Sequence, residues 1–162
     1  MLLALGPRRY DLRTRALVMG VFGPPDDLVA NGADVLETEG TGLAMPVPVC
    51  VAASDDASVG RALSAGADLV RLFHPTAGSL SLCAAAGVAV LVPRTAAGEA
   101  AAAGFPPERV VVESLLLDVT SDECPVAATA VGVIRGARIV RTADVRGARR
   151  ICDVLAAVLE AR

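Results

Sequence analysis

The sequence predicts an α/β fold: a shortened TIM-like (βα) barrel, or a partly open parallel-stranded barrel, with about six to eight strands. Three observations predict this. A glycine precedes each of several short apolar runs, these runs are apolar throughout instead of alternating, and helix-like segments stand before the glycines. Glycine closes a helix in the left-handed conformation, and a strand with two apolar faces is typical of a covered parallel sheet. We expect residues 1–162 to form a single domain.

The glycine-marked segments appear in order along the chain. They are NGADVLE (31–37), AGADLVRL (65–72), AGVAVLV (86–92), AGFPPERVVVE (103–113) and RGARIVR (135–141). Together with two further apolar runs they predict strands at 16–22, 34–38, 48–53, 68–73, 88–93, 109–113 and 137–141. The strand at 109–113 could also run on through 115–119.

Two helices are expected in the first half of the chain. Asp26 and Asp27 follow two prolines and are expected to cap a short helix at 26–31. Ser54 is the expected N-cap of the next helix, whose first turn carries acidic residues that suit the helix dipole. The residues of that helix expected on its apolar face are Val59, Ala62 and Leu63.

Two more helices are expected near the C-terminus. Ser121 is the expected cap of the first, with Pro125 in its first turns and with Val131 and Ile134 pointing inward. The second is expected at about 146–161, and its arginine-rich start is interpreted as a solvated face. Its apolar residues at helical spacing are Ile151, Val154, Leu155, Val158 and Leu159.

Two segments are too short for a full barrel. EGTGLAMPV (39–47) has no helical signal, although a helical crossover between parallel strands needs about a dozen residues. VVVESLLLDVTSDE (110–123) would have to hold two strands and a helix. Eight βα units normally take about 250 residues, and here about twenty residues are available for each. The predicted barrel is therefore trimmed.

Composition argues against several classes of partner. The net charge of −3 and the scattered cations give no footprint for nucleic acid. No apolar run reaches the roughly 18 residues that span a bilayer, and the charges of the opening MLLALGPRRYDLR follow its apolar stretch, unlike a secretion signal. We expect a cytoplasmic protein without a membrane partner. The four cysteines lack metal-ligand spacing and are expected to be small buried hydrophobes: Cys50, Cys83, Cys124 and Cys152.

The motifs resemble those of dihydropteroate synthase, the folate-pathway transferase with a pterin-binding (βα) barrel. ALVMGVFGPPDD resembles the first strand of that family, GADVLETEG its GADIIDVGGES segment, and VPVCVAAS its PISIDT strand. GADLVRLF resembles GADIINDV, and ERVVVES resembles ERIILDPG. The most specific stretch, AATAVGVIRGARIVRTADVRGAR, resembles the AATAxAxxxGAxIVRVHDV ending.

The resemblance implies a site that has lost most of its groups. The family holds a pterin diphosphate with two aspartates, an asparagine and a lysine; here Ala52 and Glu113 stand at the aspartates and Arg71 at the asparagine, and the chain has no lysine. Gly23 replaces an asparagine that helps to hold metal and diphosphate, and Arg141 alone remains of the final pair. Each lost hydrogen bond to a charged group weakens ligand binding by about 1.5 to 3 kcal/mol. A micromolar affinity corresponds to a binding free energy of only about 8 kcal/mol, so four or five such losses would cancel most of it. We therefore expect no catalytic residue and no cofactor, with Mg²⁺ relevant only to residual transferase activity.

Polar residues at the predicted strand ends allow two interpretations. Arg71, Arg94 and Arg141 could form an anion pocket inherited from the diphosphate site, since guanidinium groups suit phosphate oxygens. Alternatively they pair with glutamates across the mouth. For Glu113, retained ligand contact competes with packing against Arg94. His74 is expected to be exposed. The candidate ligand-binding residues are Arg141, Glu113, Glu37, Arg71 and Arg94, with Glu39 as a further pairing partner.

The function expected from these residues is that of a catalytically inactive paralogue with a structural or regulatory role. Surplus apolar residues on the last two helices, which form the dimer interface in the resembled family, predict a homodimer or pairing with an intact synthase. These residues are Ala127, Ala128, Val131, Ile151, Val154, Leu155 and Val158. The alternatives are an active transferase that joins pterin diphosphate to p-aminobenzoate, and a small module that binds a pterin, a phosphate or another metabolite.

Overall fold

The computed structural model describes residues 1–39 and 45–160, with side chains described up to residue 158. Two compact units divide the chain. The first unit contains Met1, Asp11–Leu36 and Ser114–Arg162, and the second contains Leu2–Tyr10 and Glu37–Glu113. The single domain of residues 1–162 stays a prediction.

The fold class is α/β with an eight-stranded parallel sheet of the TIM-like type, as the sequence predicts. The strand order is β8-β7-β6-β5-β4-β3-β10-β9. The seven predicted strands are confirmed, each within two residues at its ends, and the segment after residue 113 forms an eighth strand of its own. The bounds are β3 Leu17–Gly20, β4 Val35–Thr38, β5 Val49–Ala53, β6 Leu69–Leu72, β7 Ala89–Val92, β8 Val110–Val112, β9 Leu116–Asp118 and β10 Ile139–Thr142.

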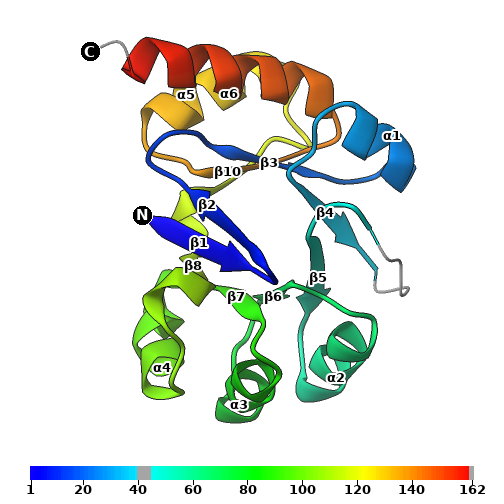
Figure 1. Ribbon diagram of the computed structural model, residues 1–162, viewed down its shortest axis with the longest axis vertical. Helices are drawn as coiled ribbons and strands as arrows, with labels where there is room; N and C mark the ends of the chain where they lie inside the picture. Colours follow the sequence, from blue (N-terminus) through cyan, green and yellow to red (C-terminus); the bar gives the residue numbers. More distant parts are fainter. Residues whose placement is uncertain (40–44, 161–162) are drawn as a thin grey trace. The chain divides into compact units, whose positions relative to one another are not determined.

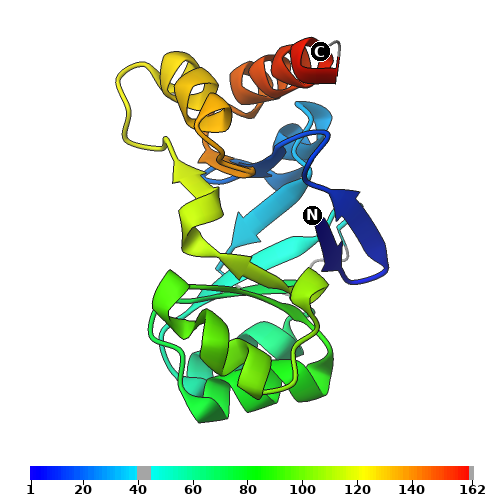
Figure 2. The same ribbon diagram turned by 90° about the vertical axis from the view of Figure 1, so that its left-hand side faces the viewer.

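The first unit is organised around β3 and β10, which pair in parallel with Val140 opposite Val18. Helices α5 (Pro125–Ile134) and α6 (Val145–Glu160) lie side by side over this part of the sheet (Figure 2). The short helix α1 (Pro25–Ala30) follows β3. Every residue of β3 and most residues of β10 are buried, which explains why polar and apolar residues do not alternate along these strands.

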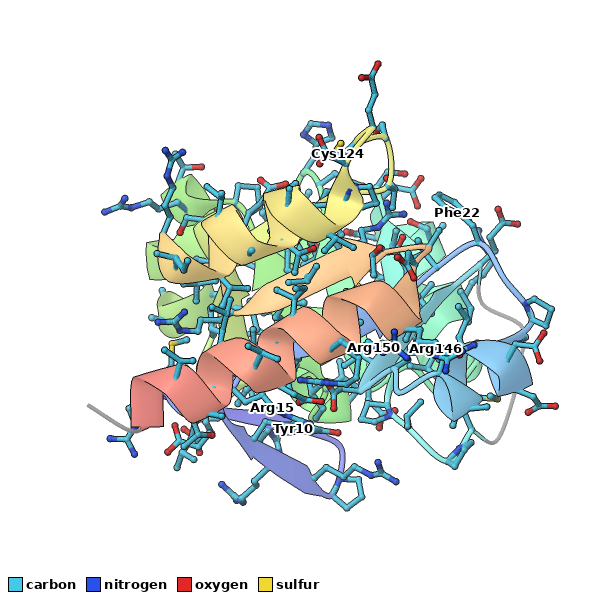
Figure 3. All side chains as sticks on the ribbon, turned by 90° about the horizontal axis from the view of Figure 1, so that it is seen from above. Tyr10, Arg15, Phe22, Cys124, Arg146 and Arg150 are labelled. Carbon is cyan, nitrogen blue, oxygen red and sulfur yellow. The ribbon has the colours of Figure 1, made fainter. Side chains whose placement is uncertain are left out.

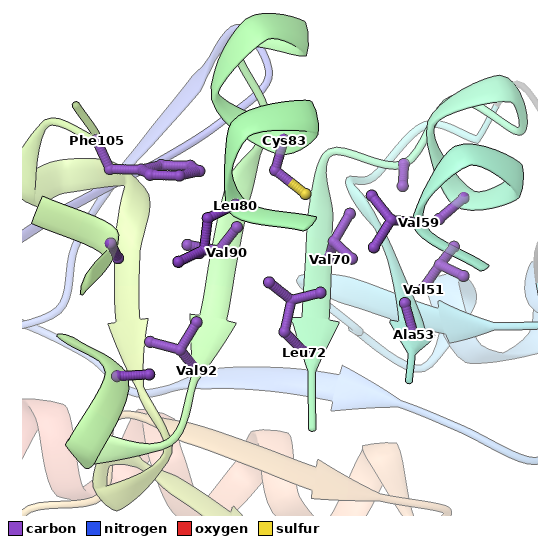
Figure 4. Packing of buried hydrophobic residues seen from close by; sticks show 14 of the residues in the cluster. Val51, Ala53, Val59, Val70, Leu72, Leu80, Cys83, Val90, Val92 and Phe105 are labelled. Atoms are coloured by element: carbon purple, nitrogen blue, oxygen red, sulfur yellow. The ribbon is translucent and has the colours of Figure 1, made fainter. Parts of the chain in front are cut away.

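The second unit has three helices over one face of β5 to β8 (Figure 1). They are α2 (Asp56–Ser64), α3 (Ala77–Ala86) and α4 (Ala97–Ala102), with short 3-10 turns at Arg94–Ala96, Pro107–Arg109 and Glu113–Leu115. The core contains Val70 and Val90 from the strands, packed with Val59, Leu80 and Phe105 (Figure 4). Aliphatic side chains fill it almost entirely, as the low aromatic content predicts.

The N-terminal hairpin was not predicted. Strands β1 (Leu2–Leu5) and β2 (Arg8–Asp11) form a separate two-stranded sheet. Gly6 turns the chain between them with a φ of 54°, a conformation that favours glycine. The two strands are only four residues long and one of them is mostly polar, so the sequence shows no alternation of polar and apolar residues that would predict strands.

The helix-closing role of the five motif glycines is confirmed. All five have positive φ angles: 96° at Gly32, 81° at Gly66, 68° at Gly87, 87° at Gly104 and 110° at Gly136. This left-handed conformation carries little cost for glycine, so the chain can leave each helix and enter the next strand within a few residues.

Three predicted helix caps are wrong. Helix α2 is capped by Asp55, which exchanges hydrogen bonds with Ser58 in a capping box, and Ser54 lies one residue too early. Helix α5 starts at Pro125 with Cys124 at the N-cap position, so Ser121 does not cap it. Proline suits the first helical position, and it sets this start. In α1, Asp26 and Asp27 occupy the first turn instead of the cap.

The predicted inward face of α5 is also wrong. Val131 is exposed and Ile134 is 67% exposed, whereas Thr129 and Val133 are buried. The reason is a close approach at Gly132, where an added Cβ would lie 2.4 Å from Leu117 Cδ2. The helix is apolar nearly all round, so its sequence offers no polar face from which to choose the buried one.

Helix α6 buries a different stripe from the predicted one. Val154 is 59% exposed and Val158 is also exposed, while Ile151 and Leu155 are half-buried. The side chain of Leu159 and the predicted helix end at residue 161 lie outside the described residues. The buried residues of this helix are Val145, Ala148 and Cys152.

Three other expectations concern particular residues. The apolar face of α2 is confirmed, because Val59 and Ala62 are buried. Of the cysteines, Cys124 is exposed, which corrects its prediction, while Cys50, Cys83 and Cys152 are buried. Most of the segment 39–47 lies outside the described residues, and residues 39 and 45–47 are not helical.

Among the described residues, no helix combines the length and the apolar character that crossing a bilayer requires.

Candidate functional site

The second unit places an arginine between two carboxylates at the ends of its strands. Arg71 Nη1 lies 3.9 Å from Glu37 Oε2, and Arg71 Nη2 lies 3.6 Å from Glu113 Oε1. Three of the predicted ligand-binding residues therefore meet in one cluster, which we call the Arg71 cluster. Glu113 is half exposed, whereas the side chains of Arg71 and Glu37 are only 13% and 12% exposed.

The guanidinium of Arg71 is poorly satisfied. Both ion-pair distances exceed hydrogen-bond length, and Nε is buried with no acceptor among the described residues. One face of the guanidinium lies over the ring of Phe73, 4.9 Å from its centroid. Arg71 thus has charge neutralisation and stacking, but its hydrogen-bonding capacity is unused within the described part of the chain.

Ala52 adjoins this arginine on the neighbouring strand. Strands β5 and β6 pair in parallel, and Ala52 is the register partner of Arg71. Ala52 is exposed although every other residue of β5 is buried. A small side chain at this position leaves the strand end open beside the guanidinium.

The first unit holds Arg141 in a tighter arrangement. Arg141 Nη1 donates a hydrogen bond to Asp118 Oδ2 at 3.0 Å and lies 3.4 Å from Thr120 Oγ1. Burial raises the pKa of the Asp118 carboxyl, but the hydrogen bonds from Thr120 and the charge of Arg141 outweigh it, so the pKa lies below the usual aspartate value. The two interpretations of Arg141 were an anion pocket and pairing with glutamates, and the structure pairs it with Asp118.

Phe22 completes the surroundings of Arg141 and was not predicted from the sequence. Its φ of 59° is the one positive value among the described residues other than glycine, and its ring is 77% exposed (Figure 3). The guanidinium of Arg141 lies 5.2 Å from the ring centroid. The following residue, Gly23, and two prolines constrain the turn here, and this GPP signal could have drawn attention to it.

The remaining predicted residues lie outside these contacts. Arg94 is exposed in a 3-10 turn, and no ion pair joins it to a described residue. Glu113 therefore faces Arg71 and not Arg94. His74 is exposed, as predicted, and Glu39 is exposed as well.

A second set of charges stabilises the opposite ends of the strands. The GAD motif aspartates Asp34 and Asp68 each accept a backbone N–H from an adjacent strand, at Val18 and Val49. Asp34 also binds Arg15 at 2.5 Å and Arg149 at 2.6 Å. Because these carboxylates stand before their strands, they are structural and do not belong to the candidate site.

The described residues do not fit a metal–diphosphate site. No group of three or more histidine, cysteine, aspartate or glutamate side chains converges among them. Gly23 supplies no side-chain oxygen, and the chain has no lysine to bind a phosphate.

No protein-family model matches the chain, and no curated protein matches it. Solved structures of dihydropteroate synthase do match: that of Stenotrophomonas maltophilia with a TM-score of 0.81 and 19% identity over 99% of each chain. The enzyme of Thermus thermophilus gives 0.80 and 22% over 98% of this chain and 99% of that chain, and that of Yersinia pestis 0.80 and 17% over 99% of each.

The fold is that of dihydropteroate synthase. The resemblance predicted from the strand and glycine motifs is thereby confirmed at the level of the fold. The dihydropteroate synthase fold is retained although the chain departs from the family motifs at Gly23, Ala52 and Arg71. Similarity in fold thus extends over the whole chain, while the strand ends carry their own set of side chains.

Proposed function

We propose that this chain is a cytoplasmic dihydropteroate synthase-like protein of the folate-pathway family that lacks transferase activity and acts as a structural or regulatory paralogue. The observation that carries the proposal is the set of groups at the strand ends. Ala52 and Gly23 offer no polar side chain, and no lysine exists anywhere in the chain.

The charges that remain support the same proposal. The departure of a diphosphate needs positive charge at the leaving group. Arg141 already donates to Asp118, and Arg71 is flanked by Glu37 and Glu113. An anionic leaving group must compete with these carboxylates, so transition-state stabilisation at either arginine is weak.

The test is an assay of pteroate formation from pterin diphosphate and p-aminobenzoate with Mg²⁺, with an intact synthase as positive control. We expect no product above the rate without protein, and no growth of a synthase-deficient strain that expresses this chain. The rival is an active transferase with a rebuilt site. Product formation that disappears in Arg141→Ala would establish that rival and refute the proposal.

We further propose that α5 and α6 form an interface, either with a second copy of the chain or with an intact synthase. Support comes from the exposed apolar side chains on both helices. Val131 and Ile134 on α5, and Val154 and Val158 on α6, are all about half exposed or more. An apolar surface of this kind is a candidate for association between proteins.

The interface proposal is tested by light scattering at micromolar concentration. We expect a dimer, or a mass shift when an intact synthase is added, and we expect the single variants Ile134→Glu and Val154→Glu to abolish it. Leu82→Glu is the matched control, because Leu82 is an exposed apolar residue of α3. A monomer that shows no shift with the synthase contradicts the proposal.

A further inference from the structure

We propose that the Arg71 cluster is a binding site for a small carboxylate ligand, recognised by the guanidinium of Arg71 from the side of Ala52. This goes beyond the proposed loss of transferase activity and does not depend on it, because it concerns equilibrium binding by one unit of the chain.

The donors of Arg71 are available. A guanidinium carries five N–H groups in a planar fork; here Nε is buried without an acceptor, and the two terminal nitrogens lie 3.9 and 3.6 Å from the nearest carboxylate oxygens, beyond hydrogen-bond length. Its side chain is only 13% exposed, so most of the charge has left water. Burying charged donors without acceptors is costly, and a bidentate oxyanion is the partner whose geometry fits this fork.

The side of Arg71 that faces β5 is open to a ligand. The ring of Phe73 covers one face of the guanidinium, which leaves its edge for a ligand. Of the two register partners of Arg71, Leu91 on β7 is fully buried, whereas Ala52 on β5 is exposed. A planar carboxylate can therefore reach the edge of the guanidinium along β5, where the side chain is a single methyl group.

The charge selects a monoanion. Glu37 and Glu113 lie 3.9 and 3.6 Å from the two terminal nitrogens and repel any anion bound there. A phosphate dianion meets about twice the repulsion that a carboxylate meets. Arg141 offers a contrast, because its Nη1 already donates a hydrogen bond to Asp118 at 3.0 Å. Arg71 is thus better suited than Arg141 to accept an external carboxylate.

The test is a titration of the intact chain followed by the arginine Nε–Hε resonances in nitrogen-15 NMR spectra. Arg71→Lys assigns the Arg71 signal by its loss. Acetate is the probe, inorganic phosphate is the comparison, and chloride keeps the ionic strength constant. We expect saturable, millimolar acetate binding at the Arg71 resonance, weaker binding of phosphate, and no response at Arg141.

Three variants sharpen the test. Ala52→Asp should shift the Arg71 resonance without any ligand and abolish the acetate response, because an internal carboxylate takes the site. Ala52→Ser, which adds no charge, should keep the response. Glu113→Gln should tighten acetate binding about fivefold, since it removes one repulsive charge from a partly exposed position. The NMR spectra also report whether each variant is folded.

Two results overturn the inference. One is an Arg71 resonance that does not respond to acetate in the folded wild-type chain. The other is phosphate binding at Arg71 as tight as that of acetate, which would reject the carboxylate class. Neither result touches the transferase assay, so failure here is distinguishable from failure of the proposed function.

Discussion

Replacing Asp34 by alanine is expected to remove a large part of the stability of the first unit. The carboxylate accepts hydrogen bonds from Arg15 at 2.5 Å, from Arg149 at 2.6 Å and from the backbone N–H of Val18 at 2.9 Å. Its side chain is 11% exposed and that of Arg149 is 12% exposed. Removing one partner of a buried ion pair costs about 3 to 5 kcal/mol. Whole domains have a free energy of unfolding of about 5 to 15 kcal/mol, so this loss is severe.

The chain contains a matched control for this prediction. Asp68 stands in the same GAD motif and accepts the N–H of Val49 at 3.0 Å, but no ion pair joins it to an arginine among the described residues. Asp68→Ala is therefore expected to cost only about 1 to 2 kcal/mol. The difference between the two variants, about 1 to 4 kcal/mol, measures what the arginines contribute at Asp34.

The assay is urea unfolding followed by far-ultraviolet circular dichroism, because the chain has no tryptophan and one tyrosine. A double-mutant cycle with Arg149→Met adds a second measurement. The double variant should lose about 1 to 3 kcal/mol less unfolding free energy than the two single variants lose together. The reason is that each single change leaves a buried charge without its partner. If Asp34→Ala costs no more than Asp68→Ala, the two arginines add nothing to the stability of the first unit, contrary to this prediction.

Three other predictions use different properties of the chain. Because the pKa of Asp118 is lowered, its pairing with Arg141 stabilises the fold fully above the ordinary aspartate pKa of about 4, and this contribution is lost as the pH falls through the lowered pKa. Asp118→Asn should therefore make the melting temperature depend less on pH in that acidic range. A pH dependence equal to that of the wild-type chain would contradict this prediction. Gly60→Ala, in an open helical position, should stabilise by about 0.5 to 1 kcal/mol, whereas Gly136→Ala, at φ 110°, should destabilise by about 1 to 2 kcal/mol, both by urea titration. In the native state Cys124 should react fast with a thiol reagent, and Cys83, whose pKa burial raises to about 11, should react only on unfolding; equal rates would disprove the burial difference.

The strands and their order along the chain were predictable because each depends on a local signal. A glycine with a positive φ, such as Gly66 or Gly136, marks the end of a helix, and this signal does not depend on how the following segment packs. The strands that follow are buried on both faces, so their sequences are uninterrupted runs of apolar residues. The short hairpin before residue 12 lacks both signals, because its turn glycine stands between strands of mixed character.

The faces of the last helices could not be predicted, because tertiary packing decides them. In α5 the contact between Gly132 and Leu117 fixes the rotation of the helix and turns Ile134 outward. No period in an almost wholly apolar segment contains this information.

The sequence predicted which residues lie at the candidate site but not the distances between them. Position at the strand ends predicted that Arg71 on β6 lies near Glu37 on β4 and Glu113 after β8, because all carboxyl ends of a parallel sheet lie at the same edge. The distances that leave the guanidinium without hydrogen bonds depend on side-chain conformations. The partner of Arg141 is Asp118, which comes from a strand that the sequence only suggested.

We expect that strand ends without lysine, and with Ala52 and Gly23 in place of polar groups, do not bind a pterin tightly. The most direct test is isothermal titration calorimetry of the chain with 6-hydroxymethylpterin, beside an intact dihydropteroate synthase as positive control. We expect no saturable heat at micromolar pterin. Saturable binding with a low micromolar Kd would contradict it.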